Sequence, residues 1–271
     1  MFVFWILFIY AAVVMLAYIF QDRLIYLPSR SDLESVRTSS NLLSLKLWPQ
    51  DDGNYKGFLP EEDPEVVKGT IVVFHGNAGS AVDRIYYVQP LQKLGYRVLL
   101  AEYPGYGART GKMGQQSFVD DGLDTVRKAG KEFGGPVYLW GESLGCGVAT
   151  AVAADKTIGI KGAVLLTPWN TLPATAQAHY WFLPARWFVR DQFDNVWNLK
   201  EFTEPVAVLM ADKDDVIPNR LTMALYDSIT ARKRLWTFNA AGHNNWPTDP
   251  ELDWWREVMD FITEKRPAPD L

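Results

Sequence analysis

One serine in the sequence has the neighbours that a hydrolytic nucleophile needs. Ser143 is the centre of the pattern GESLG at 141–145, which follows the apolar run VYLW at 137–140 and opens a segment rich in Ala, Val and Gly. A sharp turn between a strand and a helix lifts a serine hydroxyl above the edge of a sheet, and glycines on either side let the backbone approach closely. We therefore predict that Ser143 is a nucleophile. The alternative is an ordinary turn between a strand and a helix.

A serine hydroxyl needs a base, and an imidazole, with its ordinary pKa of about 6.5, suits neutral pH. The chain has three histidines. His243 comes directly after the last predicted strand, at 234–238, and a loop there can reach the edge of the sheet that carries Ser143. His75 precedes a Gly-Asn turn and His179 lies in an aromatic segment. We predict that His243 is the base.

The imidazole must in turn be oriented by a carboxylate. The loop after the strand predicted at 205–210 contains three aspartates, Asp212, Asp214 and Asp215. The loop after the strand predicted at 162–166 reads TPWNT and has no carboxylate. The acid is thus expected in the first of these loops, but spacing alone does not choose among its three aspartates.

Acyl transfer also requires two backbone N–H groups that stabilise a developing oxyanion. The amide of Leu144 is expected to be one, because this residue follows the nucleophile at the start of a helix. The other is expected from the loop HGNAG at 75–79, which follows the strand predicted at 70–74. Its small residues keep the backbone accessible. The alternative for this loop is a plain turn.

Composition excludes several other classes of function. The chain has 271 residues and a formal net charge of −5, which argues against a nucleic-acid partner. Its single cysteine, Cys146, rules out Cys-rich zinc sites, and no two histidines lie at a metal-ligand spacing. We expect no metal and no cofactor, and we expect Cys146 to be a small buried residue beneath the nucleophile.

The first 20 residues predict a membrane anchor. Residues 1–20 carry no charge, proline or glycine, and about 20 apolar helical residues span the ~30 Å hydrocarbon core of a bilayer. The segment lacks the basic start and the Ala-x-Ala site of a cleaved signal peptide. We predict a single-pass, uncleaved anchor. Arg23, Arg30 and Arg37 follow it, so the positive-inside rule favours a cytoplasmic catalytic domain.

The rest of the chain, 21–271, is predicted to form one α/β domain with a mostly parallel central sheet and helices on both faces. Short apolar runs alternate with helical segments, which is the signature of strands joined by crossover helices. The predicted strands are 43–48, 55–59, 70–74, 97–102, 137–140, 162–166, 205–210 and 234–238. The predicted helices are 82–94, 116–133, 144–155, 219–230 and 250–264.

A long aromatic insert at about 168–200 interrupts this alternation. Its composition is that of a lid over an acyl-binding groove. The alternative is that its aromatic side chains simply pack on the core.

Taken together, these features resemble those of the α/β-hydrolase superfamily, and more narrowly its single-pass, membrane-anchored serine hydrolase branch, which includes lipid and acyl-thioester hydrolases. The resemblance covers nearly the whole chain and implies the α/β-hydrolase fold. The segments that carry it are the anchor with the residues just after it, HGNAGS at 75–80, YPGYG at 103–107, GESLG at 141–145 and GHN at 242–244.

The resemblance also implies roles that spacing left open. In that branch the acid precedes an acidic or small residue and a valine, which maps to Asp214 in the triplet DDV at 214–216. The second oxyanion donor maps to Asn77. The chain departs from the pattern at Pro104, where relatives often carry arginine, and this places the rim of the pocket in doubt.

The sequence therefore predicts an esterase or lipase-like serine hydrolase that acts on carboxylic esters or thioesters. Its triad would be Ser143, Asp214 and His243, its oxyanion donors Asn77 and Leu144. The expected partners are a small-molecule or lipid acyl substrate and the membrane. A peptidase or amidase with the same triad, and a non-catalytic scaffold held at the membrane, are the alternatives.

Overall fold

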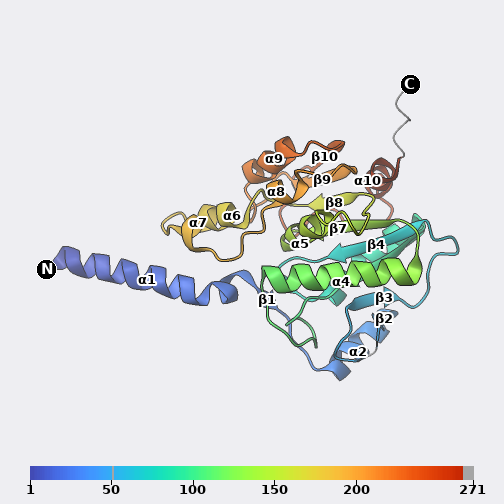
Figure 1. Ribbon diagram of the computed structural model, residues 1–271, viewed down its shortest axis with the longest axis horizontal. Coiled ribbons are helices and arrows are strands. Elements are labelled where there is room, and N and C mark those ends of the chain that lie inside the picture. Colours follow the sequence, from blue (N-terminus) through green and yellow to red (C-terminus); the bar gives the residue numbers. More distant parts are fainter. Residues whose placement is uncertain (51, 265–271) are drawn as a thin grey trace.

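A computed structural model describes residues 1–50 and 52–264. One long helix, α1 (Phe2–Ile25), projects from a layered domain that holds the rest of the described chain (Figure 1). Of the described helices, α1 alone is long and apolar enough to cross a membrane, with a mean hydropathy of 2.5 over 18 residues, none of them buried. The apolar segment predicted at 1–20 makes up most of it. The end of the predicted domain, 265–271, lies outside the described residues.

The domain is built on an eight-stranded sheet in the order β10-β9-β8-β7-β4-β6-β3-β2. Only two pairings are antiparallel, β2 with β3 and β3 with β6. The predicted class is confirmed, and every predicted strand is present with its ends shifted by at most two residues. The strands are β2 (Leu45–Trp48), β3 (Gly57–Pro60), β4 (Gly69–Phe74), β6 (Tyr96–Ala101), β7 (Val137–Glu142), β8 (Ala163–Leu166), β9 (Val206–Ala211) and β10 (Lys233–Phe238).

Side chains of a strand alternate between the two faces of its sheet, and each face here has its own layer of helices. On β4, Val72 and Phe74 join one buried cluster, whereas Ile71 and Val73 join the other. The first cluster includes the helices α4 (Gln115–Phe133), α5 (Leu144–Ala153) and α9 (Asn219–Ser228). The second includes the 3₁₀ helix η1 (Ala81–Tyr87), α3 (Val88–Lys93) and α10 (Asp253–Thr263).

The connections of β4 determine where a site can form. The chain passes from β4 to β6 on one side, and then to β7 on the other side of β4. At such a reversal the loops at the carboxyl ends of two neighbouring strands diverge and leave a crevice. The loop after β4 carries Asn77 and the turn after β7 carries Ser143, so both lie at this reversal of the strand order.

Three small elements were not predicted. The helix α2 (Leu33–Leu42) begins at Asp32, whose carboxylate accepts the N–H of Ser35. The two-residue strands β1 (Leu27–Pro28) and β5 (Ala78–Gly79) pair in parallel. Because β1 directly follows α1, this pairing joins the projecting helix to the loop after β4.

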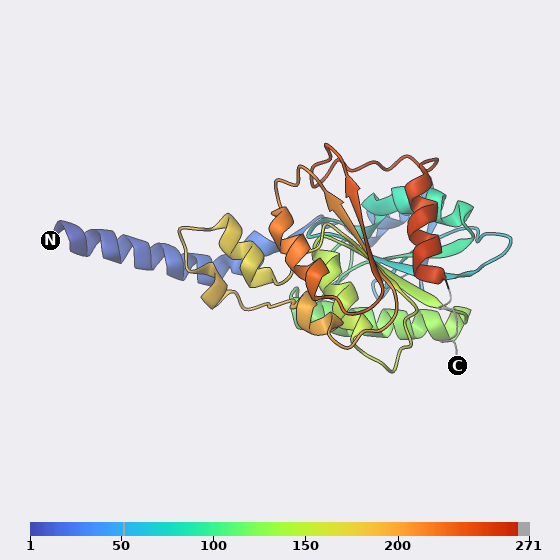
Figure 2. The same ribbon diagram turned by 90° about the horizontal axis from the view of Figure 1, so that it is seen from above.

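The insert between β8 and β9 folds into the short helices α6 (Leu172–His179), α7 (Ala185–Phe188) and α8 (Asn195–Leu199). Some of its apolar side chains, such as Leu172, are buried in the core, as the alternative interpretation expected. Three others do not pack there: Trp181, Phe182 and Trp187 are 79%, 51% and 78% exposed. Figures 1 and 2 both show α6 and α7 beside α1.

Candidate active site

The turn from β7 into α5 holds Ser143 in a backbone conformation that few residues other than glycine adopt. Its φ is 50° and its ψ is −114°, and such conformations cluster at functional sites. A Cβ on Gly145 would overlap the carbonyl oxygen of Phe74, and one on Gly141 would lie 2.6 Å from Cα of Cys146. The glycines of the pattern are therefore required by close backbone contact.

Cys146 lies beneath this turn. It is fully buried, and its thiol is close to the carbonyl oxygens of Gly141 and Leu166, at 3.2 and 3.3 Å. Burial raises the pKa of the Cys146 thiol well above its ordinary value. A thiol in this state is a poor nucleophile, because the thiolate is the reactive form.

The structure brings Ser143, His243 and Asp214 into one hydrogen-bonded series. Nε2 of His243 lies 3.0 Å from Oγ of Ser143. On the other side of the ring, Nδ1 lies 2.9 and 3.1 Å from the two carboxylate oxygens of Asp214. The side chains of His243 and Asp214 are 8% and 2% exposed. Since a carboxylate only accepts, this network assigns the proton to Nδ1 and leaves Nε2 to accept from the serine.

The three aspartates that follow β9 differ in their surroundings. Oδ1 of Asp214 accepts the N–H groups of Val216 and Ile217 at 2.9 and 2.6 Å, which fixes the carboxylate towards His243. Asp212 is half-buried with a carboxylate 3.3 Å from Nζ of Lys213, and Asp215 is exposed. Only Asp214 contacts the imidazole among the described aspartates.

The two predicted oxyanion donors lie on the loops that flank the serine. Leu144 is the first residue of α5, where N–H groups have no partner inside the helix. The side chain of Asn77 donates to the Ile25 carbonyl at 2.9 Å, and its carbonyl accepts from Leu27 N–H at 3.0 Å. Within the described part of the chain, no hydrogen bond leaves the backbone N–H of Leu144 or Asn77. Both groups thus remain free to donate.

A largely buried charged cluster next to the serine was not predicted; the side chains of Arg84 and Glu142 are 15% and 13% exposed. Glu142 receives the hydroxyls of Tyr86 and Tyr87 at 2.7 and 2.9 Å, and Nε and Nη2 of Arg84 at 3.2 and 3.1 Å. Arg84 Nη2 also donates to the Ala78 carbonyl at 3.2 Å. The cluster therefore joins the turn of Ser143 to the loop after β4. The sequence signal that could have indicated this cluster is the glutamate within the tight turn. A charge held there needs partners of opposite charge or hydrogen-bond donors.

Burial alone would raise the pKa of the Glu142 carboxyl, but the Arg84 guanidinium and the two tyrosine hydroxyls outweigh it and hold this pKa below its ordinary value. Glu142→Gln leaves Arg84 with only the exposed carboxylate of Asp83 at 4.0 Å as a counter-charge, and we expect it to lower the free energy of unfolding by about 3 kcal/mol at neutral pH. A lowered folded pKa stabilises the fold above the ordinary glutamate pKa of about 4.3, and this contribution is lost as the pH falls through the folded value. The difference in free energy of unfolding between Glu142→Gln and the wild type should therefore become smaller at acidic pH.

Thermal unfolding in detergent at pH 7 and below pH 4 measures this difference. Glu201→Gln is the matched control, because it removes the same charge from an exposed pair with Lys156. We expect the control to unfold almost as the wild type does. Equal destabilisation by the two substitutions would contradict the role given to the buried cluster.

The other two histidines lie in different surroundings. The buried ring of His75 contacts Glu102 Oε1 through Nε2 at 3.0 Å and the Gly76 carbonyl through Nδ1 at 2.8 Å. His179 is exposed at the end of α6. Among the described residues, no group of three or more His, Cys, Asp or Glu side chains could hold a metal ion.

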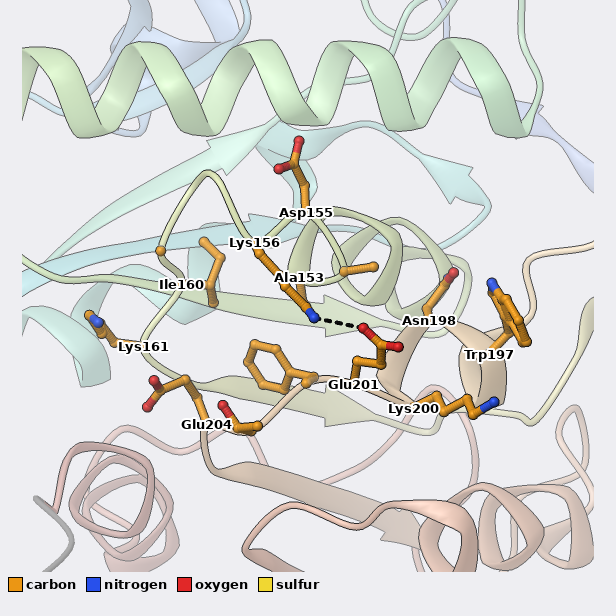
Figure 3. Close-up of a pocket in the computed structure, with 14 residues that line it drawn as sticks. Ala153, Asp155, Lys156, Ile160, Lys161, Trp197, Asn198, Lys200, Glu201 and Glu204 are labelled. Carbon is orange, nitrogen blue, oxygen red and sulfur yellow. Dashed lines mark hydrogen bonds and ion pairs between the residues drawn. The ribbon is translucent and has the colours of Figure 1, made fainter.

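A cavity of about 670 Å³ lies at the far end of α5 from Ser143 (Figure 3). It is lined by residues around Ala153 and by the end of the insert, and the Lys156–Glu201 ion pair crosses it at 2.6 Å. None of the three residues of the hydrogen-bonded series lines it. The cavity is therefore not part of the serine site.

The chain is similar in sequence to a known protein family and to individual curated proteins. A family model described as the alpha/beta hydrolase fold matches residues 69–199. An uncharacterized protein of Mycobacterium tuberculosis is 29% identical over 269 residues, which cover 94% of this chain and 91% of that protein. The lysophosphatidylserine lipase ABHD12 of Danio rerio is 30% identical over 184 residues, which cover 61% of this chain and 48% of that enzyme.

The structure of the Pyrococcus furiosus esterase Pf2001 is similar with a TM-score of 0.65 and 17% identity, and the match covers 88% of this chain and 96% of that one. At this identity the likeness concerns the fold alone. Together with the family model, it confirms the predicted fold class.

Proposed function

The chain belongs to the α/β-hydrolase superfamily, and from this premise we propose that it is a serine hydrolase that cleaves carboxylic ester or thioester bonds. The observation that carries the proposal is the unbroken series from Ser143 Oγ through the His243 ring to the Asp214 carboxylate. Three side chains from three separate loops meet in the order and at the distances that a nucleophile, its base and an orienting acid require.

The reaction would follow from the roles of these groups. As Ser143 Oγ attacks the acyl carbonyl, its proton passes to Nε2 of His243, and Asp214 stabilises the imidazolium that forms. The N–H groups of Leu144 and Asn77 would stabilise the oxyanion of the tetrahedral intermediate. The same Nε2 proton is then given to the leaving alcohol or thiol. Water, activated by His243, releases the acid from the acyl-enzyme.

We propose lipids or acylated membrane molecules as the substrates. The lipase named among the relatives supports this choice, as does the apolar surface of α1. We further propose that α1 is a membrane anchor and that the catalytic domain is cytoplasmic, since Arg23, Arg30 and Arg37 all follow the apolar segment.

A panel of substrates tests the proposed reaction. Esters and thioesters of increasing acyl length, together with amides of the same acids, would be offered to the full-length protein in detergent. We expect turnover of esters or thioesters with a preference for long acyl chains. Turnover of amides alone would replace the proposal with a peptidase or amidase, and turnover of none of them would refute it.

Removal of the helix should affect two substrates differently. A deletion of residues 2–17 keeps Tyr18, whose ring contacts Phe188, and Gln21, whose amide oxygen accepts the N–H of Arg190 at 2.8 Å. We expect nearly unchanged hydrolysis of a short, soluble nitrophenyl ester. Hydrolysis of a long-chain substrate in vesicles should fall at least several-fold, because a tether raises the effective concentration of enzyme and substrate.

Both rates would be compared at matched folded concentration. An equal loss on the two substrates would mean that the helix supports the fold. No loss on either would mean that the substrate does not reside in the membrane.

A further inference from the structure

The turn between α6 and α7 presents its large apolar side chains beside α1, and not to the core. Trp181 and Phe182 belong to this turn and Trp187 to α7, and all three are exposed. We propose that the turn, residues 180–184, inserts into the acyl-chain region of the bilayer beside α1, so that the protein is held by two elements. The inference rests on the proposed role of α1 as an anchor.

The first support is the pairing of the carbonyl groups in this turn. Nε2 of Gln177 lies 3.4, 3.4 and 2.8 Å from the carbonyl oxygens of Tyr180, Trp181 and Leu183. The carbonyl of Phe182 accepts the hydroxyl of Tyr10 at 3.0 Å, and that of Pro184 accepts the N–H of Trp187 at 3.0 Å. In water such carbonyls would be satisfied by solvent, but in hydrocarbon each must find a partner within the protein. The two N–H hydrogens of Gln177 can serve Trp181 and Leu183, and the Tyr180 carbonyl also accepts the N–H of Leu183 at 2.9 Å. Each of the five carbonyls of the turn therefore has a partner.

Several N–H groups around the turn are also paired. Tyr180 and Leu183 donate to backbone carbonyls, and the N–H of Arg186 donates to Oε1 of Gln177 at 3.2 Å. Pro184 has no N–H to satisfy. Gln177 therefore uses both ends of its amide to pair backbone groups of the turn, and within the described residues only the N–H groups of Trp181 and Phe182 in the turn have no acceptor.

The second support is that α1 and the insert become polar at the same level. Arg190 donates to Asp22 at 2.7 Å through its side chain and to Gln21 at 2.8 Å through its backbone N–H. These contacts mark where both elements leave the apolar region. Tyr10 lies 11 residues before Gln21 in the sequence, which is about 16 Å along a helix that rises 1.5 Å per residue. A turn bonded to Tyr10 therefore lies well below the headgroups.

One charged residue, Arg186, lies between Tyr180 and Val189. Its side chain is exposed and lies beside the ring of Trp187, at 5.0 Å. An arginine near a membrane boundary extends its long side chain towards the phosphates while its methylene groups stay among the acyl chains. The position of Arg186 is thus compatible with an inserted turn.

The occupant of this surface is the lipid bilayer, because the apolar tip continues the apolar surface of α1. A protein held by one helix can rotate about that helix. With a second element embedded, the domain is fixed in one orientation, and the insert that fixes it connects β8 to β9, the strand whose loop carries Asp214.

Depth-dependent quenching tests the inference directly. Cysteine would replace Trp181, Phe8 in α1, or Val66, which is 72% exposed on the domain, and each would carry an environment-sensitive fluorophore. The native Cys146 is buried, so the unsubstituted protein controls for background labelling. The labelled proteins would be reconstituted in phosphatidylcholine vesicles that contain nitroxides on the acyl chains.

We expect the probes at 181 and 8 to be quenched by the nitroxides, and the probe at 66 to be quenched only by aqueous iodide. If the probe at 8 is quenched but the probe at 181 behaves like that at 66, the inserted turn is refuted while the anchor stands. If the probe at 8 is not quenched, the anchor fails and the inference fails with it. Hydrolysis of a soluble ester, measured on the same samples, reports on the proposed chemistry separately.

Two substitutions test the hydrogen bonds of the turn. Tyr10→Phe removes the donor to Phe182. Gln177→Leu removes the contacts with the carbonyls of Tyr180, Trp181 and Leu183, and also the acceptor of the Arg186 N–H. Each should move the probe at 181 towards the headgroups. Tyr18→Phe and Gln116→Leu are the matched controls. The Tyr18 hydroxyl makes no hydrogen bond within the described residues, and the exposed side chain of Gln116 bonds only Asp120, one turn along α4. Near-ultraviolet circular dichroism verifies folding, and equal depths in all four variants would overturn the inference.

Discussion

Ser143→Ala is expected to abolish both turnover and covalent labelling by a fluorophosphonate probe. The hydroxyl that His243 accepts from is the proposed nucleophile, and the neighbouring N–H groups alone cannot form an acyl-enzyme. Loss of the triad nucleophile reduces turnover by about 10⁶ in one well-studied serine protease. Alanine removes one oxygen atom beside the imidazole, so the fold should remain intact.

Mass spectrometry of the labelled peptide and steady-state rates measure this expectation. Ser39→Ala, on the exposed face of α2, is the matched control and should label and turn over as the wild type does. Labelling that persists in Ser143→Ala would refute the assignment of the nucleophile. Labelling of the wild type at another serine would do so as well.

Asp214→Asn should lower turnover by about 10⁴, the loss that the equivalent change gives in another serine triad. An asparagine placed between the N–H groups of Val216 and Ile217 keeps its carbonyl oxygen on them and presents its NH₂ group to the His243 ring. The ring then carries its proton on Nε2 and cannot accept from the serine. Folding and substrate binding should change little.

Asp212→Asn and Asp215→Asn are matched controls in the same loop. Neither carboxylate contacts the imidazole, so both variants should keep turnover within a few-fold of wild type. Turnover rates of all three variants on one soluble ester show which aspartate orients His243. If Asp212 or Asp215 proved to be the sensitive position, the role given to Asp214 would be wrong.

The strands of the sheet could be predicted because most of them are buried between two layers of helices. A strand covered by helices on both faces is apolar at nearly every position, as TIVVF at 70–74 and PVAVLM at 205–210 are. Glycine and loop residues delimit such runs clearly. The same runs place the serine, histidine and acidic loops at one edge, because all three follow the carboxyl ends of parallel strands.

The spacing of residues along the sequence could not show which of the three aspartates orients the histidine. All three lie within one tight loop, and which carboxylate faces the ring depends on the backbone path. That path is fixed by hydrogen bonds from the N–H groups of Val216 and Ile217 to the Asp214 carboxylate, which no local pattern reveals. The resemblance to a family favoured Asp214, and the structure places Asp214 against the ring.

Contacts between distant segments were also missed. The pairing of β1 with β5 involves two residues on each side, too few for a periodic signal. The partners of Glu142 come from η1, about 55 residues earlier in the chain. The insert binds α1 through residues as remote as Tyr10 and Phe182. Sequence periodicity reports which face of an element is apolar but not which distant element will cover it.

The end of α1 couples the proposed membrane anchor directly to the loop after β4. Ile25 is its last residue, and the carbonyl of Ile25 accepts the side chain of Asn77 while Leu27 donates to the Asn77 carbonyl. No flexible linker separates α1 from its contacts with the loop after β4. The tilt of a membrane helix follows the thickness of the bilayer around it. With α1 as the proposed anchor, a change in bilayer thickness would therefore act on the loop of Asn77.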